Sequence, residues 1–140
     1  MNSPDVLSIS GSQYRARTEH VAPSTSPLGD SVLTIVIPAL NEEASIESTI
    51  MRCLAARERI CVVGGVRDVE VIVVSDGSTD RTAAIAQELA ARHPAVSVVV
   101  FEKNRGYGAA IKEGFERGRG DLVSFLDADG TCDPNYFADM

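Results

Sequence analysis

The stretch VSFLDADGT, residues 123–131, joins an apolar run to a pair of carboxylates. We predict a buried strand over residues 122–126, directly followed by Asp127 and Asp129. Side chains two positions apart point to the same side of a strand, so such a pair can converge just past the strand end. Neighbouring carboxylates repel each other unless a positive charge lies between them. The pattern therefore indicates a divalent cation that holds a diphosphate, because Mg²⁺ prefers carboxylate and phosphate oxygens.

The same order of apolar strand, polar loop and helix recurs along the preceding chain. The predicted strands span residues 33–37, 69–74, 96–101 and 122–126. After the earlier of these predicted strands, apolar residues recur at the spacing of a helix. This alternation implies right-handed parallel crossovers, so we expect an α/β fold in which helices flank a mostly parallel sheet. Ligands of such sheets bind at the carboxyl ends of the strands, where acidic side chains gather here.

The helix boundaries are predicted from capping residues. Asn41 is expected to cap the first helix, and Asp80 the second, which runs to about Arg92. A third helix follows the loop at residues 104–108 and ends near Gly118. Residues 58–67 are interpreted as an irregular connection.

The composition describes one globular domain preceded by a polar segment. Residues 1–30 are rich in Ser, Thr, Pro and Gly and predict a flexible tail, which leaves 31–140 as the folded domain. The net charge of −7 argues against a nucleic-acid partner, because binding a phosphate backbone needs clustered Lys and Arg.

Targeting signals and cysteine usage favour a cytoplasmic protein. No apolar run approaches the ~20 residues that span a bilayer, and the N-terminus lacks a signal-peptide pattern. The three cysteines have the spacing of neither a zinc site nor a disulfide framework, so we expect free thiols.

The loops after the first two strands have both structural and functional interpretations. A turn explains Gly77 and a helix cap explains Asp80, whereas Asp76 is also suited to a hydrogen bond with a nucleobase or ribose. In the loop at residues 38–43, capping and the helix dipole account for the acids. These acids would repel a phosphate, so a base or ribose contact is the functional alternative there.

The loop KNRGYG, residues 103–108, carries two cations. It is either a solvated connection or a mobile segment beside a diphosphate, with Arg105 or Lys112 as the counter-charge. Gly106 and Gly108 lack the third glycine of a dinucleotide-binding fingerprint.

Taken in series, the motifs IPALNEE, VVSDGSTDRT, KNRGYGAAIKEG and FLDADG resemble those of the family-2 inverting glycosyltransferases of the GT-A fold. The polyprenyl-phosphate branch, typified by dolichol-phosphate mannosyltransferase, is most similar, and the resemblance covers residue 32 to the end. It implies a Rossmann-like sheet and metal-dependent transfer of a sugar from a GDP- or UDP-sugar. The implied acceptor is polyprenyl phosphate at the cytoplasmic face of a membrane.

The resemblance also implies which residues hold the donor. Asp127 and Asp129 would bind Mg²⁺ or Mn²⁺ on the donor diphosphate. Thr131 stands where the mannosyltransferases often carry a metal-binding Gln. No catalytic base is assigned. The implied donor contacts are Pro38, Ala39, Glu42, Val74, Asp76, Lys112, Asp127 and Ala128.

Domains of this family usually continue past the last motif, so we expect the chain to be the N-terminal, donor-binding half of a truncated domain. The strand at 121–126 would then lie exposed at a sheet edge. One alternative is a non-catalytic nucleotide-sugar-binding fragment. Another is a phosphatase of the haloacid-dehalogenase type, with Asp127 as nucleophile and Asp129 as general acid, which leaves the upstream motifs unexplained.

Overall fold

The computed structural model describes residues 5–8 and 29–139. In this part of the chain, strands that all pair in parallel form one sheet in the order β1-β5-β2-β3-β4. The strands are β1 Asp5–Ser8, β2 Val32–Ala39, β3 Asp68–Asp76, β4 Val96–Phe101 and β5 Leu122–Phe125. The predicted α/β class and the four predicted strands, now β2 to β5, are therefore confirmed.

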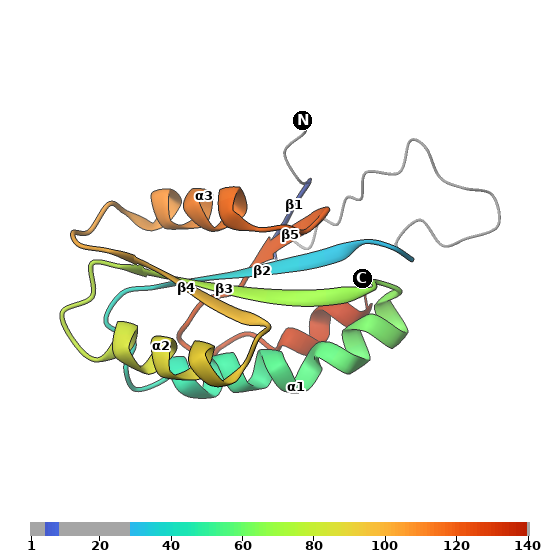
Figure 1. Cartoon of the computed structure of the whole chain (residues 1–140), viewed down its shortest axis with the longest axis horizontal. Coiled ribbons are helices and arrows are strands. Elements are labelled where there is room, and N and C mark those ends of the chain that lie inside the picture. Colours follow the sequence, from blue (N-terminus) through green and yellow to red (C-terminus); the bar gives the residue numbers. More distant parts are fainter. Residues whose placement is uncertain (1–4, 9–28, 140) are drawn as a thin grey trace.

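Helices cover both faces of this sheet. They are α1 Ile46–Gly64, α2 Thr82–Arg92, α3 Tyr107–Arg117 and the short 3₁₀ helix η1 Pro134–Asp139. Figure 1 shows α1 and α2 below the sheet and α3 above it, with η1 beside α1. The result is a three-layer arrangement, as expected when parallel strands are joined by helical crossovers.

The order of the strands places β3 and β5 on opposite sides of β2. From β2 the chain passes to β3 and then to β4, and it returns through α3 to place β5 on the other side of β2. The direction of winding therefore reverses at β2. In open parallel sheets, ligands bind at the carboxyl ends of the strands beside such a reversal.

The core follows from the β-branched composition of the central strands. Every residue of β2 is buried, because helices cover both of its faces. Ile35 and Ile37 face α1 and α2, whereas Val36 packs with Phe101 and Ala110 on the side of α3. This alternation reflects the two-residue period of a strand.

The first helix differs from its prediction at both ends. It begins at Ile46, so Asn41 does not cap it; Asn41 adopts a φ of 53° and accepts the backbone N–H of Thr79 at 2.8 Å. The helix continues to Gly64, which makes the expected irregular connection wrong for residues 58–64. Gly65 ends it with a φ of 79°, the left-handed conformation that glycine adopts without a Cβ penalty.

The strand β1 corrects two further expectations. Asp5–Ser8 belong to the predicted flexible tail, yet they pair in parallel with Leu122–Phe125. β5 consequently lies between β1 and β2 instead of at an exposed edge. The added strand provides partners for backbone groups that an edge strand leaves unpaired. Residues 1–4 and 9–28 of the predicted tail lie outside the described residues.

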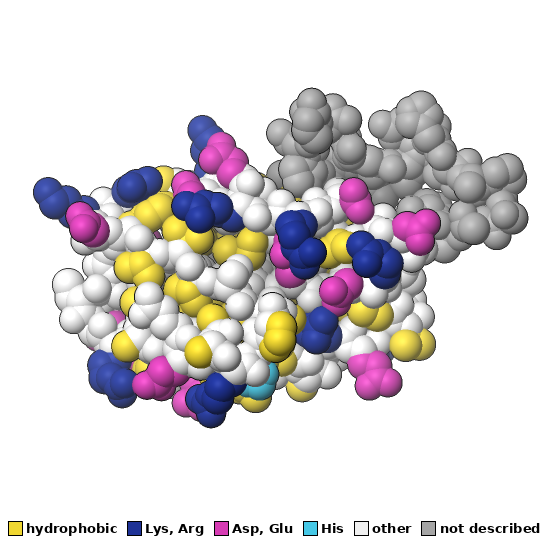
Figure 2. Space-filling model, in the orientation of Figure 1, with side chains coloured by type: hydrophobic (Ala, Val, Ile, Leu, Met, Phe, Trp, Pro, Cys, Tyr) yellow, Lys and Arg dark blue, Asp and Glu magenta, His cyan; other side chains and the backbone are white. Residues whose placement is uncertain are grey.

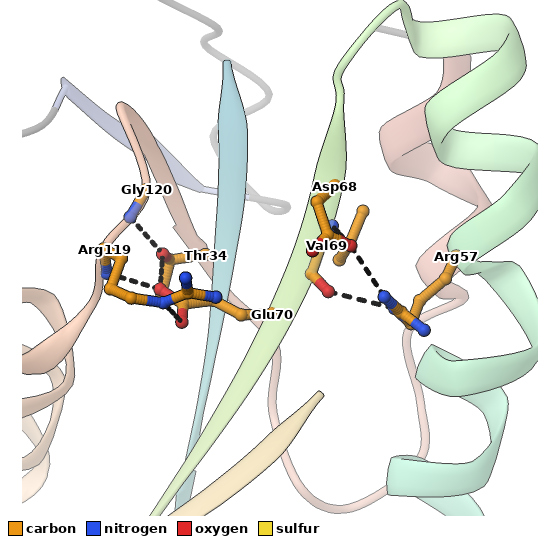
Figure 3. Close-up of polar contacts among 7 residues, drawn as sticks. All are labelled: Thr34, Arg57, Asp68, Val69, Glu70, Arg119 and Gly120. Atoms are coloured by element: carbon orange, nitrogen blue, oxygen red, sulfur yellow. Dashed lines mark hydrogen bonds and ion pairs between the residues drawn. The ribbon is translucent and has the colours of Figure 1, made fainter. Parts of the chain in front are cut away.

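The buried carboxylate of Glu70 links β3 to β2 and to the loop between α3 and β5, at the amino ends of the strands (Figure 3). Glu70, 8% exposed, accepts the hydroxyl of Thr34, and also the backbone N–H and the guanidinium of Arg119. The Thr34 oxygen accepts the backbone N–H of Gly120 at 2.9 Å. These contacts hold the connection from α3 to β5 against the sheet.

A second polar contact in Figure 3 attaches α1 to the start of β3. The Arg57 guanidinium donates to the Asp68 carboxylate at 2.6 Å and to the backbone oxygen of Val69 at 3.0 Å. Desolvation opposes the charged form of Asp68, but hydrogen bonds from Val69 and Arg57 outweigh it and lower the pKa of this carboxyl.

On the face shown in Figure 2, basic and acidic side chains are interspersed and form no continuous basic surface. None of the helices in residues 29–139 is long and apolar enough to cross a membrane. Cys53, Cys61 and Cys132 are free thiols, as their spacing predicted.

Candidate active site

A cleft of about 490 Å³ lies at the carboxyl ends of β2, β3 and β5, beside the reversal of the winding direction. Among the described residues, its walls carry four carboxylates and no Lys or Arg. The lining residues are Pro38, Ala39, Leu40, Glu42, Asp76, Asn104, Gly106, Tyr107, Ala110, Asp127, Ala128 and Asp129. Loops far apart in the sequence thus build one acidic cleft.

Most residues that the sequence singled out meet in this cleft. Pro38, Ala39 and Glu42 come from the end of β2, Asp76 from β3, and the segment 127–129 from the end of β5. Val74 does not line the cleft, because it is fully buried in the core. Lys112 is exposed on α3 and does not line the cleft either. Donor contacts by Val74 and Lys112 stay predictions.

Asp127 is held by an aromatic hydroxyl that the sequence did not point to. The phenol of Tyr107 donates to Oδ1 of Asp127 at 2.7 Å. The Tyr107 ring meets Phe125 edge-on, with ring centroids 6.2 Å apart. Desolvation and the hydrogen bond to Asp127 raise the pKa of Tyr107, so this phenol is a neutral donor at physiological pH.

Asp129 is oriented within its own loop. Its Oδ1 accepts the backbone N–H of Thr131 at 3.0 Å and the hydroxyl of Thr131 at 2.7 Å. These bonds stabilise the charged form and lower the pKa of Asp129. Thr131 thus orients the Asp129 carboxylate through these bonds, and Thr131 itself does not line the cleft.

Side chains of α1 and of the residue before it fix the loop that carries both aspartates. The hydroxyls of Ser45 and Thr49 donate to the backbone oxygen of Ala128 at 2.7 and 3.1 Å. Arg52 donates to the backbone oxygens of Gly130 and Cys132 at 2.9 and 3.1 Å. The carboxylate pair is therefore attached to a regular helix, which limits its movement.

Asp76 anchors the loop between β4 and α3. Only 4% exposed, it accepts the backbone N–H of Arg105 at 2.6 Å, that of Gly106 at 3.0 Å, and the side-chain amide of Asn104 at 3.2 Å. A carboxylate offers about four lone-pair positions, and the described residues occupy three of them, which leaves one for a ligand. The side chain of Arg105 turns away, and its guanidinium lies 4.0 Å from the centre of the Phe101 ring.

The loops after β2 and β3 are tied to each other. The backbone N–H of Glu42 donates to the Thr82 hydroxyl at 2.8 Å, and the side chain of Glu42 accepts from Ser45 at 3.2 Å. Asp80 lies two residues before α2, and its carboxylate accepts the backbone N–H of Thr82, the first residue of that helix, at 2.9 Å. Arg81, not Asp80, occupies the N-cap position and makes no side-chain capping bond, so the prediction that Asp80 caps this helix is wrong.

The aspartate pair is an incomplete set of cation ligands. In the described part of the chain, no group of three or more His, Cys, Asp or Glu side chains is placed to hold a metal ion. Mg²⁺ and its relatives are commonly bound by one or two carboxylates together with substrate phosphates. Asp127 and Asp129 fit that mode, in which the remaining ligands come from a diphosphate and water.

Leu40 and Ala110 line the cleft without having been predicted as site residues. Three further contributors, Asn104, Gly106 and Tyr107, come from residues 103–108 and were also missed. The signal for them was weak, because the KNRGYG segment is equally typical of a solvated loop. Arg105, one of the two residues expected to supply the counter-charge, is absent from the lining, as is Lys112.

A parallel sheet covered by helices on both faces, with an acidic cleft at its winding reversal, defines the chain as a doubly wound type of α/β domain. The family model "Glycosyl transferase family 2" matches residues 34–140. The chain therefore belongs to glycosyltransferase family 2.

Curated relatives carry related names. The chain is 44% identical over 104 residues to an undecaprenyl-phosphate 4-deoxy-4-formamido-L-arabinose transferase of Pseudomonas aeruginosa, covering 74% of this chain and 29% of the relative. It is 41% identical over 107 residues to a dolichyl-phosphate beta-glucosyltransferase of Drosophila melanogaster, covering 74% and 33%. The chain thus spans about a third of the length of these relatives.

Solved structures agree on the fold. A mannosyltransferase of Pyrobaculum calidifontis in complex with GDP-Man and Mn²⁺ superposes with a TM-score of 0.61 at 27% identity, covering 79% of this chain and 30% of that one. A glucosyl-3-phosphoglycerate synthase of Mycobacterium tuberculosis with Mn²⁺ and UDP gives 0.54 at 30% identity, covering 81% and 41%. The predicted GT-A fold and the predicted family are confirmed, and the phosphatase alternative is not favoured.

Proposed function

We propose that this chain forms the donor-binding part of a metal-dependent glycosyltransferase that moves a sugar from a nucleoside-diphosphate donor to polyprenyl phosphate. The main observation behind this proposal is the cleft itself, whose lining in the described part of the chain has four carboxylates and no Lys or Arg. A diphosphate enters such a cleft only with a cation that offsets the repulsion.

The residues of the cleft divide into two groups in this proposal. Asp127 and Asp129 hold Mg²⁺ or Mn²⁺, which neutralises charge on the departing nucleoside diphosphate when it is bound. Asp76 and the loop at residues 38–42 face the nucleoside, with the open lone-pair position of Asp76 accepting from the base or ribose. The Mn²⁺ complexes of two structural neighbours support a divalent cation in general.

The acceptor is proposed from chemistry and from the relatives together. Two relatives are named for undecaprenyl-phosphate and dolichyl-phosphate acceptors. A phosphate acceptor is already ionised at neutral pH, so its attack on the sugar needs no strong base. A phosphate acceptor is therefore compatible with this cleft, in which we assign no residue as the catalytic base. Because a polyprenyl chain resides in a bilayer, we expect the enzyme to act at the cytoplasmic face of a membrane.

Titration calorimetry with UDP and with GDP, in Mn²⁺ and in chelator, tests the donor and metal assignments. We expect binding to be much tighter in Mn²⁺, and we expect Asp129→Asn to abolish most of that difference. Asp133→Asn is the matched control, because Asp133 is an aspartate outside the cleft. Equal affinities of the unmodified chain in Mn²⁺ and in chelator would contradict the proposal.

A further inference from the structure

Tyr107 makes a contact that packing does not require. It is the first residue of α3, the residue is 53% exposed, and its hydroxyl donates to Oδ1 of Asp127 at 2.7 Å. Within the described residues, no hydrogen bond to Oδ2 of Asp127 is present, so that oxygen stays available for a ligand. The phenol thus holds one oxygen of the carboxylate and leaves the other free.

The position of Tyr107 is set by the loop before it. Gly106, with a φ of 105°, precedes the helix, and its backbone N–H is bound by the buried carboxylate of Asp76. The ring of Tyr107 also rests edge-on against Phe125, which lies two residues before Asp127. Tyr107 and Asp127 are therefore both next to well-packed segments, which restricts the movement of the Tyr107 hydroxyl away from Asp127.

We propose that Tyr107 is a positioning residue for Asp127, and that its hydrogen bond to Oδ1 orients the carboxylate so that Oδ2 serves as the cation ligand. This inference rests on the proposed function of the cleft. Ligating carboxylates are commonly held by such outer hydrogen bonds, and losing one typically costs about 10–100-fold in metal affinity. An unrestrained carboxylate would have to be ordered by the cation itself.

The test compares Tyr107→Phe with the unmodified chain, using UDP as the probe in Mn²⁺ and in chelator. The substitution removes only the hydroxyl and retains the ring that contacts Phe125. Tyr136→Phe is the matched control, because Tyr136 is 60% exposed on η1 and lies outside the cleft. We expect Tyr107→Phe to weaken UDP binding in Mn²⁺ by about 10–100-fold, with the affinity in chelator unchanged and Tyr136→Phe without effect.

A second readout detects the contact directly. The chain contains no Trp, so its near-ultraviolet spectrum reports on tyrosines. After subtraction of the absorption of UDP itself, we expect Mn²⁺ with UDP to perturb the tyrosine signal in the unmodified chain and in Tyr136→Phe, and to leave that of Tyr107→Phe nearly unperturbed. Unchanged thermal unfolding of Tyr107→Phe excludes a folding defect as the cause.

The outcomes separate this inference from the proposed function. An equal loss of UDP affinity in Mn²⁺ and in chelator would place the hydroxyl on the nucleotide and overturn the positioning role. Full affinity of Tyr107→Phe in both conditions would also overturn it. If the unmodified chain showed no Mn²⁺ dependence, the proposed function would fail first, and the inference with it.

Discussion

The buried carboxylate of Asp76 accepts the backbone N–H of Arg105 at 2.6 Å, and this bond joins the end of β3 to the loop that precedes α3. The same carboxylate accepts from Gly106 and Asn104. A residue that the sequence marks as a nucleoside contact therefore also holds in place a loop that lines the cleft.

The first prediction concerns this anchor. Asp76→Asn replaces one acceptor oxygen by an amide that faces N–H donors, so we expect a loss of about 1–3 kcal/mol in the free energy of unfolding. Amide hydrogen exchange at residues 104–106 should accelerate more than in α2. Urea denaturation checks the first effect and exchange the second. Asp139→Asn, which removes only an exposed ion pair with Arg59, should change stability by less than about 1 kcal/mol. Equal losses of unfolding free energy in Asp76→Asn and Asp139→Asn would argue against a role of Asp76 in holding this loop.

The second prediction concerns Gly77, the residue after Asp76, whose backbone closely approaches the loop before α3. Gly77 has a φ of 76°, and a Cβ there would overlap with the backbone of Lys103 and Asn104. Gly77→Ala should destabilise the fold by about 2–5 kcal/mol, because the left-handed backbone and the crowding both oppose a methyl group.

Gly108→Ala is the matched control for that substitution. Gly108 lies in α3 without a left-handed backbone, and the space that an added methyl group would take is open, so up to about 1 kcal/mol of stabilisation is expected. Urea midpoints measure both variants, and changes of the same sign would contradict the argument.

The third prediction concerns the buried carboxylate at the opposite end of the sheet. Glu70→Gln places an amide among the donors of Arg119 and Thr34, and about 1–3 kcal/mol of stability should be lost. Glu113→Gln removes an exposed pair with Arg117 and should cost about 0.3–0.5 kcal/mol. Thermal unfolding of both variants provides the measurement; a Glu70→Gln loss as small as that of Glu113→Gln would show that the cluster contributes little.

The fourth prediction is a pH dependence. The pKa of Asp68 is lower in the folded chain than its ordinary value of 3.8, so its charged contacts stabilise the fold above that value and are lost as the pH falls through the folded pKa. Asp68→Asn should therefore be about 0.5–1 kcal/mol less stable than the unmodified chain at neutral pH, and the gap should close in acid.

Arg57→Met serves as the comparison for that pH series. It removes the same ion pair and also the bond from Arg57 to the backbone oxygen of Val69, which does not titrate. Part of its deficit should thus persist in acid. Chemical unfolding across the pH series distinguishes the two variants, and a gap for Asp68→Asn that widens in acid would refute the assignment.

Short-range patterns in the sequence were enough to identify the chain's layers and the acidic ends of its strands. Runs of Val and Ile mark β2 and β3 because a strand buried on both faces needs apolar residues at nearly every position. Asp76, Asp127 and Asp129 follow such runs, and parallel strands bring their carboxyl ends to one edge. The family motifs lie in these same loops, so the cleft could be expected.

The tertiary structure alone decided how those loops meet. The bond from Tyr107 to Asp127 joins residues 20 positions apart, and that from Arg105 to Asp76 joins residues 29 apart. Likewise, β1 takes its place beside β5, although nothing in Asp5–Ser8 predicted a strand. Such contacts depend on the order of the strands and on the packing of α3 against the sheet. Residue periodicity records only which face of an element is apolar, and it carries no information on which distant element will cover that face.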